Sequence, residues 1–177
     1  PSHPMAGTEN SGPNAAFDSL FENKTTIICE PEKRNTTAYQ LIKNMYICLK
    51  MNIVEMNAEE HDMHVAYVSH ISHISSFALA NTVLDIEEDH LNIFNLASGG
   101  FESTVRLAKS SPEMWMPIFM HNKKYVVEAI EHYIKHLNMF LKAINEDNSL
   151  EIKRKITDAN HIRKVLDNIN LKNKIKA

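Results

Sequence analysis

Residues 57–84 read NAEEHDMHVAYVSHISHISSFALANTVL, and this stretch determines the fold predicted for the whole chain. Asn57, followed three residues later by Glu60, predicts a capping box, in which two side chains satisfy amide groups at the start of a helix. Apolar residues then recur at the spacing of one helix face, and neither proline nor glycine interrupts them. The sequence therefore predicts one long helix that is mostly buried toward its carboxyl end.

The middle of this predicted helix is polar. Ser69, His70, Ser72 and His73 surround a single isoleucine. Polar groups inside a packed helix need hydrogen-bond partners or must face a cavity. Because His70 and His73 are three residues apart, their rings occupy neighbouring parts of one face. We interpret Ser69, His70 and His73 as the lining of a site. The alternative, core histidines satisfied by backbone carbonyls, stays open.

Composition bounds the class of protein. The chain has 177 residues, enough for one core, of which 44% are hydrophobic and 23% charged, as in globular proteins. A net charge of −3 gives no reason to expect nucleic acid or an anionic membrane as a partner. No apolar run approaches the ~20 residues that cross a bilayer. Cys29 and Cys48 lie in apolar runs, so we expect buried free thiols and a cytoplasmic protein.

The other segments favour a mainly α fold. A seam of apolar residues in steps of four and three is typical of helix-on-helix packing, often with another chain; it comprises Val126, Ile130, Tyr133, Leu137, Phe140 and Ile144. Before the central helix, the sequence predicts a loop over 1–12, a short helix over 14–21, a strand over 24–29, a helix over 37–50 and an extended link over 51–56. After it, the sequence predicts helices over 85–96, 102–109 and 112–145, and an amphipathic helix over 150–169. The helix over 85–96 is expected to stop at Ser98-Gly99-Gly100.

Two further residues could carry chemistry. His3 follows Ser2 and precedes small residues, so it could accept the proton of a substrate hydroxyl, although a lone loop histidine more often lies on the surface. Arg106 has apolar neighbours, which suggests a clamp for a carboxylate or phosphate, with a structural ion pair as the alternative.

Metal and nucleotide motifs are missing. His61, His64, His70 and His73 lack the i, i+4 histidine spacing of helical zinc sites, so we predict no metal site. The sequence contains neither GxGxxG nor GxxxxGK[ST], and therefore no nucleotide fingerprint.

Four motifs, in order, resemble the prephenate dehydrogenase family, which includes arogenate-using relatives. They are SHPMAGTENSG (2–12), LFE-x-K-x-x-I-I (20–28), MNAEEHDMHVAYVSHISHISSFALAN (56–81) and GGFESTVRLAKSSPEMW (99–115). Members have a Rossmann-type NAD(P) domain followed by an all-helical dimerisation domain. The resemblance implies that residues 1–33 are the end of the first domain, a remnant of loop, helix and strand that carries SHPMAGTE. It implies that residues 34–177 are the second domain.

The resemblance also implies an activity. The family oxidatively decarboxylates prephenate to 4-hydroxyphenylpyruvate in tyrosine biosynthesis, with NAD or NADP as hydride acceptor. It implies a homodimer formed through the helical domain, with L-tyrosine as a feedback inhibitor in some members. Because the fingerprint of the dinucleotide site is missing from this chain, we expect the chain by itself to be inactive. The cofactor-binding residues are left unassigned.

Residue by residue, the resemblance implies roles in one site. His3 matches the catalytic histidine, and Arg106 matches the arginine that holds a substrate carboxylate. The other implied substrate-binding residues are Ser69, His70, His73, Gly99, Met114 and Trp115, and His73 also relates to tyrosine binding. Glu9 matches a carboxylate that gates the pocket. Ser103 stands where some relatives carry an aspartate of that gate, which puts the gate and tyrosine sensitivity in question.

Three other functions are alternatives to prephenate dehydrogenase. The first is arogenate dehydrogenase. The second is a non-catalytic dimerisation module that binds an aromatic amino acid. The third, a helical chorismate mutase, is disfavoured because its site needs several cations around a dianion, and the four arginines here are dispersed.

Overall fold

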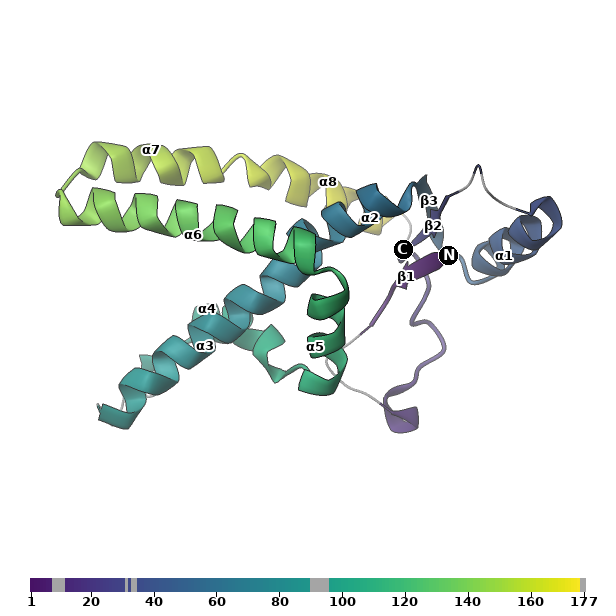
Figure 1. Cartoon of the computed structure of the whole chain (residues 1–177), viewed down its shortest axis with the longest axis horizontal. Coiled ribbons are helices and arrows are strands. Elements are labelled where there is room, and N and C mark those ends of the chain that lie inside the picture. Colours follow the sequence, from purple (N-terminus) through teal and green to yellow (C-terminus); the bar gives the residue numbers. More distant parts are fainter. Residues whose placement is uncertain (8–11, 31, 33–34, 90–95, 176–177) are drawn as a thin grey trace. The chain divides into compact units, whose positions relative to one another are not determined.

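The structure is a computed structural model that describes residues 1–7, 12–30, 32, 35–89 and 96–175, with the side chains of 88–89 and 169–175 left out. The chain forms two compact units, residues 1–129 and residues 130–177. Among the described residues, helices account for most of the chain, and the strands lie near its amino end (Figure 1). The expectation of a mainly α protein with a short amino-terminal remnant of another domain is confirmed.

A small sheet occupies the amino-terminal part of the first unit. Its strands are β1 (Ser2–Met5), β2 (Thr25–Cys29) and β3 (Asn52–Met56), in the order β1-β2-β3. β1 runs antiparallel to β2 and places His3 opposite Ile27, whereas β3 runs parallel to β2. The predicted strand over 24–29 thus lies at the centre of the sheet, and the extended link over 51–56 is its parallel neighbour.

The two faces of β2 are covered by different elements, because successive side chains of a strand point to opposite sides. Ile28 packs with Tyr39 and Tyr46 of α1 (Thr36–Cys48), the helix that connects β2 to β3. Ile27 on the other face packs with Val65 of α2 (Ala58–Val65). The sheet is therefore held between the first helix and the beginning of the long central helix.

The central helix is interrupted once. It consists of α2, a π-helical turn η3 (Ala66–His70) and α3 (Ile71–Asp89). The capping box of Asn57 and Glu60 is present. In η3 the amide of Ile71 donates to the carbonyl of Ala66, which adds one residue to the turn, as π-bulges often do at functional sites. The predicted long helix is confirmed, but hydrophobic spacing alone did not reveal this turn. The expected burial toward the carboxyl end of the helix is wrong, because Leu79 and Leu84 of α3 are 36% and 52% exposed.

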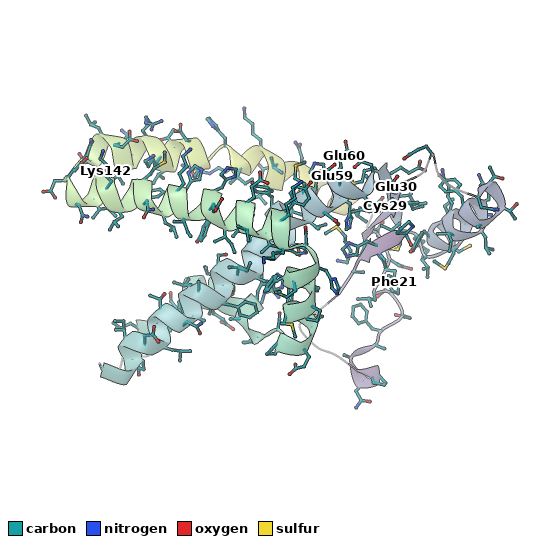
Figure 2. The ribbon with its side chains drawn as sticks, in the orientation of Figure 1. Phe21, Cys29, Glu30, Glu59, Glu60 and Lys142 are labelled. Atoms are coloured by element: carbon teal, nitrogen blue, oxygen red, sulfur yellow. The ribbon has the colours of Figure 1, made fainter. Side chains whose placement is uncertain are left out.

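Acidic side chains gather where the central helix begins. Glu30, Glu59 and Glu60 lie near one another at the end of the sheet and the start of α2 (Figure 2). Glu30 accepts a hydrogen bond from the amide of Ala58 at 3.1 Å. Carboxylates at this position satisfy free amides and match the positive end of the helix dipole. They fix the entry of α2, and with it the position of the histidines that follow.

Shorter elements complete the first unit. They are η1 (Pro13–Ala15), α4 (Gly99–Val105), the 3₁₀ turn η5 (Arg106–Lys109), α5 (Pro112–His121) and the first part of α6 (Lys123–Asn145). Buried Ser76 of α3 donates to the carbonyl of Thr104 at 3.1 Å, which joins α4 to the central helix. Ser111 caps α5 by accepting from the amide of Met114.

The second unit is helical. It contains the rest of α6, then α7 (Ser149–Ala159) and α8 (Ile162–Ile175). Asn148 caps α7 by accepting from the amide of Glu151 at 3.0 Å. Arg154 and Lys155 hold the pKa of Glu151 down, at about 2. Several large apolar side chains of this unit are exposed, namely Tyr133, Ile134, Leu137, Leu141, Ile144, Leu150, Ile156, Ile162, Val165 and Leu166.

Several details of the sequence prediction were wrong. Residues 2–5 were expected in a loop and form β1, because pairing with a neighbouring strand outweighs their weak local preference. The helix expected over 14–21 is only the turn η1. The helix expected over 112–145 is broken at Asn122, and the helix expected over 150–169 is broken at residues 160–161, between α7 and α8. Gly99 and Gly100 begin α4, and residues 90–95 of the helix that they were expected to stop lie outside the described residues. Cys48 is exposed, while Cys29 is buried as expected.

Among the described residues, no helix is long and apolar enough to cross a membrane.

The stability of the first unit should depend on the centre of its sheet. Ile27 is 4% exposed, so Ile27→Ala should lower the free energy of unfolding by about 2–5 kcal/mol, since it removes buried methyl groups and leaves a cavity. The matched control is Ile47→Ala at a position 56% exposed, which should change it by less than about 1 kcal/mol. Urea titration of both variants provides the measurement, and equal losses would contradict this packing.

Candidate functional site

A cavity of about 480 Å³ lies within the first unit. It is bounded by β1 and the residues after it, by the end of η3 and the start of α3, by η5, and by α5. Its lining residues are His3, Pro4, Met5, Ala6, Gly7, Ser69, His70, His73, Arg106, Leu107, Ser110, Met114, Trp115 and Ile118. Four segments that are distant in sequence thus meet around one space, and each of them carries at least one residue predicted for the site.

His3 is the end of a chain of hydrogen bonds. Its Nδ1 lies 2.8 Å from Nε2 of His61, and Nδ1 of His61 lies 2.8 Å from a carboxylate oxygen of Asp62. Because a carboxylate only accepts, His61 donates to it from Nδ1. A neutral His61 then accepts at Nε2, so His3 donates from Nδ1 and keeps the lone pair on its own Nε2. The chain therefore fixes His3 as a hydrogen-bond acceptor.

The charge state of His3 suits that role. Burial lowers the pKa of His3, and the neighbouring His61 lowers it further. His3 is consequently neutral at pH 7, with its acceptor nitrogen free of a proton. A neutral imidazole lining a cavity can take a proton from a bound hydroxyl group.

His73 is held between a carbonyl and an indole. Its Nδ1 donates to the carbonyl of Ser69 at 3.0 Å, and its ring stacks on Trp115 with 3.5 Å between centroids. Burial lowers the pKa of His73, the Ser69 carbonyl raises it, and the charge of Arg106 lowers it. The neutral ring then has its lone pair on Nε2. A backbone carbonyl therefore satisfies the Nδ1–H of His73, as expected for a core histidine. The ring nevertheless lines the cavity, as expected for a site residue.

His70 is more deeply buried, at 7% exposed. Its Nδ1 lies 3.3 Å from the side-chain nitrogen of Asn122. Its ring meets Trp115 edge-on, with centroids 6.0 Å apart. Burial lowers the pKa of His70, and the neighbouring histidines, first His3, lower it further.

Arg106 and Trp115 line the cavity with a guanidinium group and an indole ring. Arg106 is the first residue of η5, is exposed, and acts on His73 through its charge. The buried indole nitrogen of Trp115 has no hydrogen-bond partner among the described residues. Buried donors without a partner are uncommon in proteins.

The cavity brings together most of the predicted site residues. His3, Ser69, His70, His73, Arg106, Met114 and Trp115 all line it. Gly99 is exposed at the start of α4 and is not part of the lining. Glu9 lies outside the described residues. Ser103, which was expected to alter the gate, donates to the carbonyl of Gly100 at 2.9 Å.

Three residues that contact the site were not predicted. His61 was considered only as a metal ligand, Asp62 was given no role in the site, and Asn122 was hidden inside a supposed continuous helix. The adjacent pair His61-Asp62 in the first turns of a helix was the available signal. Nothing in the spacing marked Asn122.

Neither a metal nor a dinucleotide site is built by these residues. Over the described ranges, no group of three or more His, Cys, Asp or Glu side chains could hold a metal ion. The sequence also has no glycine-rich phosphate loop of the kind that binds a dinucleotide. We therefore assign no cofactor contact to this chain.

Comparisons with known families agree with the two parts of the fold. The amino-terminal sheet and the helices define the end of a nucleotide-binding domain joined to a helical domain. A model of "Prephenate dehydrogenase, nucleotide-binding domain" matches residues 1–55, and one of "Prephenate dehydrogenase, dimerization domain" matches residues 57–166. The chain belongs to the prephenate dehydrogenase family.

Individual relatives support this assignment. Prephenate dehydrogenase of Bacillus subtilis (strain 168) is 31% identical over 161 residues, which cover 91% of this chain and 43% of the relative. Cyclohexadienyl dehydrogenase of Zymomonas mobilis is 32% identical over 145 residues, which cover 81% of this chain and 50% of the relative. A crystal structure of prephenate dehydrogenase from A. aeolicus, in complex with hydroxyphenyl propionate and NAD+, is similar with a TM-score of 0.84 and 32% identity, covering 93% of this chain and 58% of that one. The chain thus spans about half the length of the curated relatives it matches.

The electrostatic link between Arg106 and His73 can be measured directly. Arg106→Gln should raise the pKa of His73, because it removes a positive charge that disfavours the imidazolium. Titration of the imidazole resonances by NMR gives this pKa. Lys109→Gln, which removes a charge from the same turn, is the matched control and should leave it unchanged. If both variants, or neither, move the pKa of His73, Arg106 is not the cation beside it.

Proposed function

We propose that this chain is the substrate-binding portion of an enzyme that oxidatively decarboxylates prephenate to 4-hydroxyphenylpyruvate. The observation that carries the proposal is that His3 and Arg106, far apart in sequence, line one cavity. Prephenate has a ring hydroxyl and two carboxylates. A neutral imidazole suits the hydroxyl, and a guanidinium suits a carboxylate. The names of the Bacillus subtilis and A. aeolicus relatives support the same substrate.

In this proposal His3 is the catalytic residue. Nε2 of His3 accepts a hydrogen bond from the ring hydroxyl and takes its proton, while the hydroxyl-bearing carbon would give up a hydride to the nicotinamide and become a carbonyl. Loss of carbon dioxide from the opposite ring carbon then sends the bonding electron pair through the ring onto that oxygen, which takes a proton to give the phenol. Asp62 and His61 keep His3 in the required tautomer, and they also stabilise the positive charge that develops on it.

The other lining residues hold the substrate. Arg106 at the edge of the cavity pairs with a carboxylate, in two parallel hydrogen bonds if the geometry allows. The indole ring of Trp115 packs against the substrate from the wall of the cavity. His70, His73, Ser69 and Met114 form the wall around the ring. Gly99 as a further substrate contact and Glu9 as a gate remain proposals that rest on the family resemblance alone.

The proposal extends to cofactor and assembly. The hydride acceptor is NAD or NADP, held by a nucleotide-binding domain of which the sheet up to Met56 is the end. The helical domain, which we place from α2 onward, forms a homodimer. The match to a dimerization domain and the exposed apolar side chains of α6 support this. L-Tyrosine competes for the same cavity as a feedback inhibitor. The two free cysteines suit a reducing cytoplasm.

Two other functions have specific support. The name of the Zymomonas mobilis relative, cyclohexadienyl dehydrogenase, favours arogenate as an alternative substrate. A binding module without chemistry is the second alternative, because the chain contains no dinucleotide fingerprint. Calorimetry of this chain with prephenate and with tyrosine separates the module from the enzyme portion. Binding of tyrosine alone would favour the module.

The intact protein tests the reaction. Prephenate-dependent reduction of NAD+ or NADP+, followed by absorbance, should occur with the full-length protein. The 177-residue chain alone should show none, because it lacks the dinucleotide site. Reduction with arogenate only would change the substrate, and no reduction with either would contradict the proposal. Turnover by this chain alone would show that it contains a cofactor site after all.

His3→Asn in the intact protein tests the role of the imidazole. Turnover should fall by about 10²-fold or more, since asparagine cannot take the proton, while the Michaelis constant changes little. The profile of kcat/KM against pH should also lose the fall at low pH that is caused by protonation of His3. His136→Asn, a substitution of a histidine on α6 that does not line the cavity, is the matched control. Equal turnover in wild type and His3→Asn would remove His3 from the mechanism.

A further inference from the structure

Asn122 is a buried polar residue at the junction of two helices. It is 9% exposed and lies between α5 and α6. Its own amide donates to the carbonyl of Ile118, and its carbonyl accepts from the amide of Val126, both within 3.1 Å. The backbone at this junction is therefore satisfied, and the side chain is free to act elsewhere.

The carboxamide of Asn122 reaches two groups of the site. Its nitrogen lies 2.7 Å from the backbone carbonyl oxygen of Asp62 and 3.3 Å from Nδ1 of His70. A carbonyl oxygen only accepts, so the nitrogen rather than the oxygen of the carboxamide must face Asp62. The second hydrogen on that nitrogen is then available to His70, whose Nδ1 must accept it.

This contact determines which nitrogen of His70 carries the proton. With Nδ1 accepting, neutral His70 is protonated at Nε2. Nε2 of His70 makes no hydrogen bond within the described residues, and His70 lines the cavity. Neutral His70 thus offers a donor to a ligand, whereas His3 offers an acceptor.

We propose that Asn122 is a positioning residue that fixes His70 as a neutral Nε2–H donor and supports the acceptor state of His3. The support for His3 runs through Asp62, whose backbone Asn122 holds and whose carboxylate orients His61. The ligand recognised by this pair has a hydroxyl for His3 and an oxygen acceptor for His70. The role in turnover rests on the proposed function, whereas the tautomer of His70 does not.

Protonation of His70 would oppose this arrangement. An imidazolium carries hydrogen on Nδ1, which would face the donor nitrogen of Asn122. The positive forms of His3, His73 and His61 also disfavour the imidazolium, Asp62 favours it, and burial lowers the pKa of His70 most strongly. The neutral donor state is therefore expected throughout the neutral pH range.

Nitrogen-15 NMR of the imidazole rings in this chain tests the inference directly. Long-range proton–nitrogen correlations at pH 7.5 should show His70 protonated at Nε2 and unprotonated at Nδ1. The wild-type spectrum is sufficient by itself, so the test does not depend on whether a variant folds. A spectrum with the proton on Nδ1, or with a mixture of tautomers, would overturn the proposal.

Substitution of Asn122 provides the second measurement. Asn122→Asp replaces the donor with an acceptor, so His70 should move its proton to Nδ1 and its pKa should rise. Asn122→Ala should give a mixture of tautomers. Asn148→Asp, at the cap of α7, is the matched control and should leave the spectrum of His70 unchanged. An unchanged His70 spectrum in folded Asn122→Asp would also overturn the proposal.

In the intact protein, the same variant separates positioning from stability. Asn122→Asp should shift the acidic limb of the kcat/KM profile to higher pH, because protonated His70 no longer matches the ligand. A purely structural role would lower activity at all pH values without moving the limb, and would contradict positioning. If the wild-type tautomer is the expected one but no dehydrogenase activity exists, the proposed function fails while the assignment of His70 stands.

Discussion

The hydrogen bond between His3 and His61 is the interaction on which the site depends. It joins β1, at the amino end of the chain, to α2, the start of the central helix. It can form because β1 pairs with β2 and because Ile27 of β2 packs against Val65 of α2. The sheet therefore does more than end a nucleotide-binding domain, since it brings His3 into hydrogen-bond contact with the central helix.

Burial and hydrogen bonding together define the chemical character of the cavity. Three histidines line it, and burial lowers the pKa of each, so the wall is neutral at pH 7. Arg106, which also lines the cavity, supplies a positive charge. Under the proposed function, a dianionic substrate would meet Arg106 as the cation for binding and His3 as the neutral base for chemistry, on two different residues.

Sequence patterns predicted the parts of this structure that depend on local order. The capping box of Asn57 and the helix after it followed from spacing, and the resemblance of four motifs indicated seven of the residues that line the cavity. The tautomers, by contrast, depend on contacts between distant segments. β1 is a strand because it pairs with β2. The break at Asn122 places the side chain of that residue against α2 and η3, and the spacing of apolar residues along the sequence does not reveal this contact. Residues 8–11, with Glu9, lie outside the described part of the chain.

The most direct test of this account is a crystal structure of the intact protein with hydroxyphenyl propionate, the ligand described in the complex of the A. aeolicus relative. We expect the phenol oxygen to lie within hydrogen-bond distance of Nε2 of His3, and the carboxylate to pair with Arg106. A ligand bound outside this cavity, or bound in it with the carboxylate toward His3, would contradict the assignment of the two residues.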